Sequence, residues 1–394
     1  MRILQLGKFY PVRGGVEKVM YDLTESLSAR GIGCDMLCSS LKGLPGRVKD
    51  LPGGGRVICV KPLAKVAGTM IAPEMISWLK EHCREYDIIH VHHPDPMAAL
   101  ALRRSGYRGR VILHWHSDIL KQKFFLTFYK PLLNWLIRRA DTIVGTSPVY
   151  VKESPWLQKV QDKCTYVPIG IEPVETTGSE VIKGRYHDKK IVLSIGRLIP
   201  YKGFEYLIEA AKYLPEDYRV IIGGTGPLQE QLEKQIAALN LEDKVSLEGY
   251  IKDGGLGAYY GAADVFVMSS TMKTEAFGIV QIEAMSCGLP VVSTCIPASG
   301  VAWVNQDGES GLTVEPRNAK ALADAIEKIC AAPAPYQEGA RKRYEALFTK
   351  EKMLEKIRTI YGILKVFTRS ARRRLAGGFL RNTKEYGILD GHGV

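Results

Sequence analysis

Short apolar runs alternate with stretches of helical periodicity along the first half of the chain. The run Ile3–Leu6 predicts a strand that ends at Gly7, followed by a loop through Gly15. Apolar residues at helical spacing then predict a helix closed by Gly31: Val16, Val19, Met20, Leu23 and Leu27. Further strands are predicted at Cys34–Cys38, Val57–Val60, Asp87–His92, Val111–Trp115 and Thr142–Gly145, with helices around Ile71–Glu85 and Met97–Arg104.

The composition changes after Gly170. Residues 171–190 are mostly polar and poor in apolar periodicity, which predicts a connection between two domains. A second alternating series follows. It predicts strands at Ile191–Ile195, Arg219–Ile222, Val245–Leu247, Val265–Met268 and Val291–Ser293, and helices at Phe204–Tyr213, Leu228–Leu239 and Ile279–Met285.

Strands that alternate with helices are typical of parallel, doubly wound sheets, so the predicted fold class is α/β with two facing Rossmann-like domains. Their predicted bounds are 1–170 and 191–345, with the linker 171–190 between them. A helix at 346–366 and a basic tail at 367–394 are expected to follow. Because parallel sheets bind ligands at the carboxyl ends of their strands, we expect the site in the cleft between the domains.

The overall composition is that of a globular protein. Of the 394 residues, 46% are hydrophobic and 24% charged, and no apolar stretch approaches the roughly 18 residues of a membrane span. The N-terminal apolar run is too short for a signal peptide, and the eight cysteines are scattered without a Cys-x-x-Cys pair. These features favour a cytoplasmic protein with reduced thiols.

The net charge of +12 is unevenly distributed. Residues 1–170 hold 25 Lys and Arg against 14 Asp and Glu, residues 171–364 hold 22 against 26, and residues 365–394 hold 7 against 2. The positive excess therefore belongs to the first half and the tail. It favours an anionic partner such as nucleic acid, a membrane surface or a phosphorylated substrate, although a solvated basic face explains it equally well.

Two glycine-containing segments lie where such a cleft would need them. Gly14 and Gly15 stand between the first strand and the first helix, where the backbone can approach a ligand and free N–H groups can meet a phosphate. Arg197 follows another strand, with Lys202 five residues on, and two cations there can clamp a diphosphate. Taken alone, the first pattern also suits an ordinary strand-to-helix turn, and the second suits exposed basic residues.

A third glycine-rich segment, Gly223–Pro227, contains Gly224 and Gly226 and follows a predicted strand. It is not a dinucleotide fingerprint, because the third glycine would fall at the position of Gln229. It is not a P-loop either, since no Gly-Lys-Ser/Thr follows. We interpret it as a tight loop near a nucleotide.

The most specific pattern is a pair of carboxylates, Glu275 and Glu283, with seven residues between them. Gly278 permits the loop to turn directly into a helix, which leaves Glu275 in the loop and Glu283 about two turns along. Ionised carboxylates accept hydrogen bonds in pairs and suit vicinal diols, so these two can hold two different sugars. The amides between them, from Phe277 to Ile279, would face an anion at the helix N-terminus.

These elements occur in the order found in the family-four retaining glycosyltransferases, which the chain resembles over residues 1 to about 360. Each motif is weak alone, but jointly they are specific. The matching segments are Gly14–Glu17, His114–Asp118, Gly196–Gly203, Gly223–Pro227 and Glu275–Glu283. The resemblance implies the GT-B fold, with the acceptor bound by residues 1–170, the nucleotide sugar by 191–345, and the helix 346–366 returning to the N-terminal domain.

The resemblance also implies a role for each matching position. Glu275 would hold hydroxyls of the donor sugar and Glu283 the ribose diol, while His116 would lie beside the donor sugar. The cations Arg197 and Lys202 would neutralise the departing diphosphate, where catalysis should reside. The other donor contacts would come from Gly14, Gly15, Gly224, Gly226, Tyr250, Ile251, Phe277, Gly278 and Ile279. Because the chain contains no Asp-x-Asp sequence, we expect neither a metal nor a cofactor besides the nucleotide sugar.

Five histidines at two strand ends offer an alternative: His90, His92, His93, His114 and His116. Histidines at such strand ends are also typical of metal-dependent hydrolases, with Asp95 or Asp118 as further ligands. A hydrolase would leave the spacing of Glu275 and Glu283 without a purpose, so we rank it well below the transferase.

Residues 121–139 interleave basic and aromatic residues with large aliphatic ones. The pattern predicts a helix, with Pro131 inside, that either lies on an anionic membrane surface or packs on the first domain through Trp135 and Leu136. A second membrane contact could come from the tail, through Arg369, Arg372, Arg373 and Arg374. These features favour a lipid-linked, anionic acceptor such as a polyprenyl-diphosphate glycan over nucleic acid, for which no recognition module is present.

The segment from His116 to Lys123 is similar to enzymes of bacterial O-antigen and exopolysaccharide assembly, especially mannosyltransferases. This resemblance implies GDP-mannose as the donor, with a UDP-hexose as the alternative. It also implies retention of the anomeric configuration and a location in the cytoplasm, on the inner face of the cytoplasmic membrane.

Overall fold

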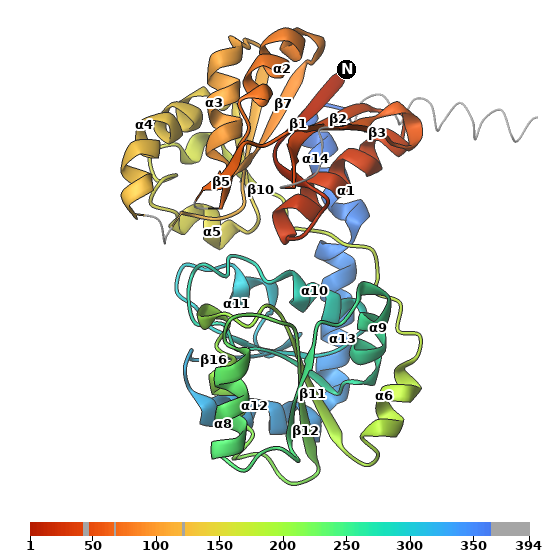
Figure 1. The fold of residues 1–394 in the computed structure, drawn as a ribbon. Coiled ribbons are helices and arrows are strands. Elements are labelled where there is room, and N and C mark those ends of the chain that lie inside the picture. The colour runs from red at the N-terminus through yellow and green to blue at the C-terminus, as the bar shows by residue number, and fades with distance from the viewer. Residues whose placement is uncertain (42–46, 67, 120–122, 364–394) are drawn as a thin grey trace, which may run out of the picture.

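The computed structural model describes residues 1–41, 47–66, 68–119 and 123–363, which form two lobes (Figure 1). The upper lobe in Figure 1 contains one large sheet, and its strands are β1 (Arg2–Tyr10), β2 (Gly33–Ser40), β3 (Arg47–Asp50), β4 (Arg56–Val60), β7 (Ile88–His93), β8 (Arg110–Trp115), β9 (Thr142–Gly145) and β10 (Cys164–Tyr166). They follow the order β10-β9-β8-β7-β1-β2-β4-β3. A small antiparallel hairpin joins β5 (Ala64–Val66) to β6 (Thr69–Ile71).

The lower lobe has a sheet of order β13-β12-β11-β14-β15-β16. Its strands are β11 (Lys190–Ile195), β12 (Tyr218–Gly223), β13 (Val245–Gly249), β14 (Val265–Met268), β15 (Val291–Thr294) and β16 (Gly311–Val314). All of its strand pairs are parallel, and in the upper sheet only β3 and β4 pair antiparallel. The predicted α/β class, with two Rossmann-like domains, is confirmed.

Helices cover both sheets. Those of the upper lobe are α1 (Gly15–Ala29), α2 (Glu74–His82), α3 (Pro96–Ser105), α4 (Lys123–Arg139) and α5 (Pro148–Glu153). The following helices are α6 (Ser179–Arg185), α7 (Phe204–Ala210), α8 (Gln229–Ala238), α9 (Asp253–Ala262), α10 (Ile279–Ser286), α11 (Val301–Val304), α12 (Ala319–Ala331), α13 (Pro333–Arg343) and α14 (Lys350–Tyr361).

The hydrophobic pattern explains why these elements form. Strands of a parallel sheet are covered on both faces, and Val192 and Leu193 of β11 are accordingly fully buried. Helix α1 buries the face that carries Val19, Leu23 and Leu27, at the predicted spacing. The carboxylate of Asp95 caps α3 by accepting hydrogen bonds from the amides of its first turn.

Three parts of the upper sheet differ from the sequence prediction. Strand β1 does not end at Gly7 but continues to Tyr10, after an irregularity between Leu6 and Phe9 at which both Gly7 and Lys8 have positive φ. Strands β3 and β10 were not expected, because they are short and partly exposed. At this positive-φ turn, the amide of Lys8 donates to Oδ2 of Asp95 and its Nζ donates to the carbonyl of Pro94.

The polar segment 171–190 is more than a connection. It contains α6, which packs against α9 and buries Ile182. One buried residue in seven leaves no visible periodicity, so composition alone could not reveal this helix.

The C-terminal helix α14 packs on the upper lobe (Figure 1). The hydroxyl of Tyr361 accepts a hydrogen bond from Nε2 of Gln5 at 2.9 Å and lies 2.6 Å from Nδ1 of His90. Where the two crossovers between the lobes meet, the amides of Ile171 and Lys350 donate to Phe348 and Ile171, each at 2.9 Å. The arginine-rich tail lies outside the described residues.

Helix α4 packs on the upper lobe, with Leu133 and Leu136 fully buried and Trp135 partly buried, whereas Phe128 is 72% exposed. Packing on the first domain, one of the two predicted alternatives, is therefore present, and contact of the outer face with a membrane stays a prediction. Among the described residues, no helix has both the length and the apolar character required to cross a bilayer.

Candidate active site

Loops at the carboxyl ends of β11, β12 and β13 are joined by backbone hydrogen bonds. The amide of Gly196 donates to Gly223 at 2.9 Å, that of Leu198 to Thr225 at 3.0 Å, and that of Gly224 to Gly249 at 2.7 Å. A Cβ on Gly224 would lie 1.8 Å from the carbonyl oxygen of Gly196. The predicted glycine-rich segments are therefore adjacent, and Gly224 must be glycine for the loops to approach so closely.

The loop after β14 is fixed to the same edge. The amide of Thr271 donates to the carbonyl of Tyr201 at 2.8 Å, and a Cβ on Gly203 would lie only 2.2 Å from the carbonyl oxygen of Ser269. This approach brings together two predicted site residues, with Nζ of Lys202 2.5 Å from Oε2 of Glu275. Their side chains are 13% and 11% exposed, so each compensates a charge that is largely removed from water.

The second predicted carboxylate, Glu283, is on α10, and the hydroxyl of Tyr260 donates to its Oε2 at 2.8 Å. Helix α10 begins just after Gly278, whose φ of 78° favours glycine. A Cβ on Gly15 would lie 2.8 Å from Cδ1 of Ile279. The positive N-terminal ends of α1 and α10 therefore meet across the cleft, an arrangement that attracts an anion.

The other predicted site residues are exposed, belong to the core or allow a close approach of the backbone. Arg197 is exposed, Tyr250 is 69% exposed, and Ile251 packs towards Gly223. Phe277 is 3% exposed and contacts Phe348, so its side chain belongs to the core. The remaining glycines make close approaches: a Cβ on Gly14 would lie 2.6 Å from Oε2 of Glu17, and one on Gly226 would lie 2.4 Å from the oxygen of Leu198.

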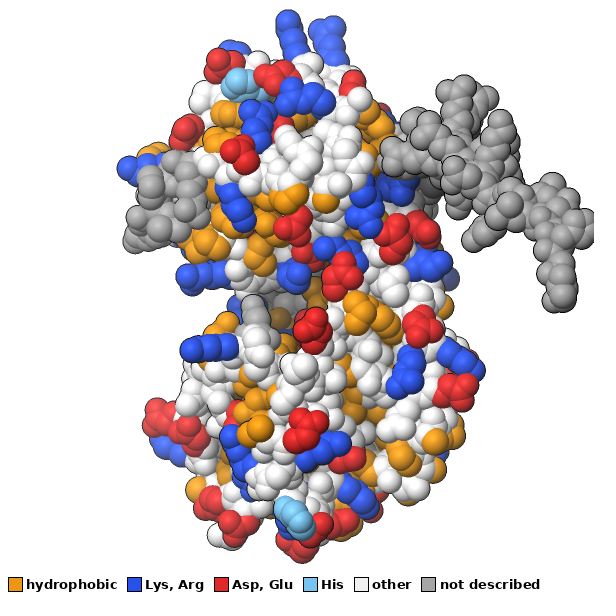
Figure 2. All heavy atoms as spheres, turned by 90° about the vertical axis from the view of Figure 1, so that its right-hand side faces the viewer, with side chains coloured by type: hydrophobic (Ala, Val, Ile, Leu, Met, Phe, Trp, Pro, Cys, Tyr) orange, Lys and Arg blue, Asp and Glu red, His pale blue; other side chains and the backbone are white. Residues whose placement is uncertain are grey.

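The sequence reasoning missed an ion pair between the lobes. Nζ of Lys273 lies 3.0 Å from Oδ2 of Asp118, in a position 5.1 Å from the ring centroid of Tyr150. It also donates to the carbonyl of Glu153 at 3.2 Å. The surface is hollowed where the two lobes meet (Figure 2). The only signal in the sequence was the position of Lys273, two residues before Glu275.

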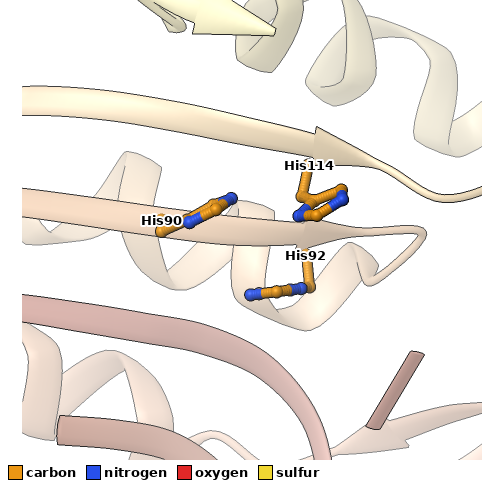
Figure 3. A group of neighbouring side chains, drawn as sticks. All are labelled: His90, His92 and His114. Carbon is orange, nitrogen blue, oxygen red and sulfur yellow. The ribbon is translucent and has the colours of Figure 1, made fainter. Parts of the chain in front are cut away.

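Four of the five predicted histidines stack together: His90, His92, His114 and His116, whereas His93 stacks on Trp115 instead. His90 and His92 point to the same face of β7, and His114 approaches them from β8 (Figure 3). Nδ1 of His92 lies 2.9 Å from Nε2 of His116 and Nε2 of His92 lies 2.8 Å from Oε1 of Gln5. Burial lowers the pKa of His116 well below its usual value, and the neighbouring histidines and Lys8 lower it further, so the ring is neutral at pH 7.

The histidines can be tested as a metal site. Ligand nitrogens of His90, His92 and His114 lie within 4.8 Å of one another, and both nitrogens of His114 are buried without a hydrogen-bond partner among the described residues. The two carboxylates considered as further ligands are engaged elsewhere, since Asp95 caps α3 and Asp118 pairs with Lys273. Both nitrogens of His92 are also hydrogen-bonded, so the arrangement does not fit the hydrolase alternative.

Two family models match the chain. The model for group 1 glycosyl transferases matches residues 178–346, and that for glycosyltransferase family 4 matches residues 13–175. An O-antigen chain mannosyltransferase of Escherichia coli is 30% identical over 92% of this chain and 99% of its own length. A D-rhamnosyltransferase of Pseudomonas aeruginosa is 30% identical over 89% and 92%, respectively.

Solved structures share the fold. A sucrose-phosphate synthase from Thermosynechococcus elongatus superposes with a TM-score of 0.76 at 24% identity, over 92% of this chain and 99% of the other. The Anabaena protein HepE, solved with UDP-glucose, gives a TM-score of 0.72 at 20% identity over 92% and 99%. The chain therefore belongs to the group 1 glycosyltransferases, with the GT-B fold of two facing Rossmann-like domains.

Proposed function

We propose that this glycosyltransferase is a retaining enzyme that moves mannose from GDP-mannose to a lipid-linked glycan during assembly of a bacterial surface polysaccharide. The observation that carries the proposal is the contact of Lys202 with Glu275, at the edge of the sheet where Glu283 also lies. The mannosyltransferase and D-rhamnosyltransferase relatives, each matched over most of its length, support the sugar and the pathway class. The UDP-glucose complex of HepE supports the alternative, a UDP-hexose donor.

In this proposal the two carboxylates hold the two sugars of the donor. Tyr260 orients the carboxylate of Glu283, which accepts hydrogen bonds from the ribose diol. Glu275 accepts hydrogen bonds from hydroxyls of the transferred hexose. Since Glu275 already accepts from Lys202 and from the hydroxyl of Ser270, its position is set before the sugar arrives.

The diphosphate is the leaving group, so its growing charge must be stabilised in the transition state. Lys202 can turn from Glu275 towards it, and Arg197, which has no ion pair among the described residues, supplies a second cation. The first-turn amides of α1 and α10 lack intrahelical partners and add further donors, from Gly15, Gly278 and Ile279. This set of donors would make a bound metal unnecessary.

His116 is proposed to contact the transferred sugar from the upper lobe. As a neutral ring it can accept or donate one hydrogen bond to a hydroxyl, and it does not repel the positive charge that develops at the anomeric carbon. The basic upper lobe would meet the lipid-linked acceptor at the cytoplasmic face of the membrane.

A thermal-shift panel with GDP, UDP and ADP tests the donor assignment. GDP should raise the melting temperature most, because at equal concentration the ligand that binds most tightly stabilises the native state most. Transfer from GDP-mannose should then persist in EDTA, and the anomeric coupling of the product should match that of the donor. A larger shift with UDP would select the alternative donor, and no shift with any nucleotide would contradict the proposal.

A further inference from the structure

An apolar pocket of about 300 Å³ opens on the upper lobe, outside the proposed donor site. Helices α3 and α4 form its walls through Met97, Leu100 and Leu132, and the β5–β6 hairpin closes one side through Val66 and Ile71. Its volume would hold about ten water molecules at roughly 30 Å³ each. Among the described residues that line it, only Thr69 and Tyr129 are polar, so water there would find few hydrogen-bond partners.

The rim of the pocket is apolar as well. Val66 of the hairpin is 43% exposed and Phe128 of α4 is 72% exposed, and both line the pocket, while Leu63, just before the hairpin, is 76% exposed. Figure 1 shows α3, α4 and β5 in the same lobe. Exposed large apolar side chains grouped around an apolar pocket mark a surface that meets hydrocarbon.

Tyr129 gives a second, independent indication of a ligand. It lines the pocket and is 8% exposed, and its hydroxyl is buried without a hydrogen-bond partner among the described residues. A buried hydroxyl without a partner is costly, whereas an oxygen of a bound molecule would satisfy it.

Three lysines lie next to residues that line the pocket in sequence or in contact. Nζ of Lys8 donates to the carbonyl of Pro94, two residues before Pro96 of the lining, and its charge partly offsets the rise in the pKa of Asp95 that burial causes. Lys65 precedes Val66 and lies 5.6 Å from the ring centroid of Phe9, and Lys130 follows Tyr129. Among the described residues, none of the three forms an ion pair with a carboxylate.

We propose that this pocket holds the hydrocarbon chain of the lipid that carries the acceptor sugar, with a phosphate oxygen at the hydroxyl of Tyr129 and the phosphate charge near Lys8, Lys65 and Lys130. The inference rests on the proposed function and adds to it the place of the lipid. Ile119 lines the pocket only three residues after His116. An acceptor lying from the pocket past Ile119 would therefore bring its sugar to the cleft while its chain stays out of water.

Calorimetric titration of the full chain, saturated with the nucleotide that stabilises it most, tests the pocket. Farnesyl diphosphate should bind at least tenfold more tightly than inorganic diphosphate. Leu100→Trp fills the pocket and should weaken farnesyl diphosphate at least tenfold, whereas Val181→Trp, on an exposed position of α6, should not. Lys65→Gln combined with Lys130→Gln should weaken farnesyl diphosphate several-fold and leave farnesol unchanged.

Equal affinity for farnesyl diphosphate and inorganic diphosphate, or no effect of Leu100→Trp, would overturn the pocket assignment. The proposed function would still stand in that case if a nucleotide raised the melting temperature. Conversely, farnesyl diphosphate binding without any nucleotide shift would uphold the pocket and contradict the proposed nucleotide-sugar donor. If Leu100→Trp lacks a native circular dichroism spectrum, Val66→Trp blocks the same pocket from its exposed rim.

Discussion

Lys273 of the lower lobe places Nζ 3.0 Å from Oδ2 of Asp118 in the upper lobe. Asp118 is almost fully buried, and its Oδ1 accepts hydrogen bonds from Trp115 at 2.9 Å and Ser154 at 2.7 Å. Hydrogen bonds within the upper lobe thus fix the carboxylate of Asp118, and Lys273 extends to it from the lower lobe. The pair ties the loop that carries Glu275 to the strand end that carries His116, across the cleft between the lobes.

We expect Lys273→Gln to favour an open cleft. Removing one partner of a buried ion pair costs about 3–5 kcal/mol, and an open form would avoid part of this cost because water would reach Asp118. The turnover number should fall about tenfold or more, and the radius of gyration from small-angle scattering should rise. Lys152→Gln, on an exposed position of α5, is the control and should change neither quantity. Wild-type turnover in Lys273→Gln would show that the pair has no part in closure.

Glu275→Gln removes a charge without changing size. In the proposed complex, hydrogen bonds from the donor sugar to Glu275 position the reacting carbon. We therefore expect the rate of sugar transfer to fall at least 100-fold while nucleotide affinity changes less than threefold. Steady-state transfer and calorimetry of the nucleotide measure the two effects. The matched control is Glu230→Gln, which breaks an exposed ion pair with Lys234 on α8 and should leave both unchanged. A parallel loss of nucleotide affinity would assign Glu275 to the nucleotide rather than to the sugar.

Much of the fold was predictable, since buried parallel strands such as Ile191–Ile195 are short apolar runs that differ sharply from the helices between them. The elements that escaped include the well-buried α12, for which no helix was predicted, and two elements with little burial, β10 and α6. The stability of β10 and α6 comes from the neighbours on which they pack, and a local pattern does not contain that information.

Some residues of the candidate site were likewise predictable from the sequence and others were not. Lys202 and Glu275 belong to loops whose motifs are local, so each could be recognised before the structure showed their contact. The contacts between Lys273 and Asp118, and between Tyr361 and His90, join segments more than 150 residues apart and involve ordinary residue types. Only the fold brings them together.

Gly224→Ala tests the packing of the nucleotide loops. Its Cβ would lie 1.8 Å from the oxygen of Gly196, and φ at this position is 141°, so the loops after β11 and β12 must separate. We expect nucleotide affinity to fall at least tenfold, as measured by calorimetry, with a lower melting temperature. Gly254→Ala, where a Cβ meets nothing within 4 Å, is the control and should retain wild-type affinity. Unchanged affinity in Gly224→Ala would mean that this loop does not shape the nucleotide site.

The buried histidines predict how stability depends on pH. Burial lowers the pKa of His93 well below 6.5, with a smaller contribution from Lys8, so the unfolded chain binds a proton near pH 6 that the native protein does not. Stability is therefore fully present above about pH 6.5 and is lost as the pH falls towards the folded pKa, by up to about 1.4 kcal/mol per pH unit for each such histidine.

His93→Phe isolates one of these protons. The ring stacks on Trp115 at 4.0 Å between centroids, and neither of its nitrogens has a hydrogen-bond partner among the described residues, so phenylalanine can occupy the same space. Urea unfolding at pH 5.5, 6.0 and 7.5 should show a shallower loss of stability in this variant than in the wild type, by about 1 kcal/mol per pH unit below pH 6. His187→Gln, at an exposed position, should reproduce the wild-type slope. If the unfolding free energy of His93→Phe and of the wild type depended on pH with the same slope, the proton taken up on unfolding would belong to another group.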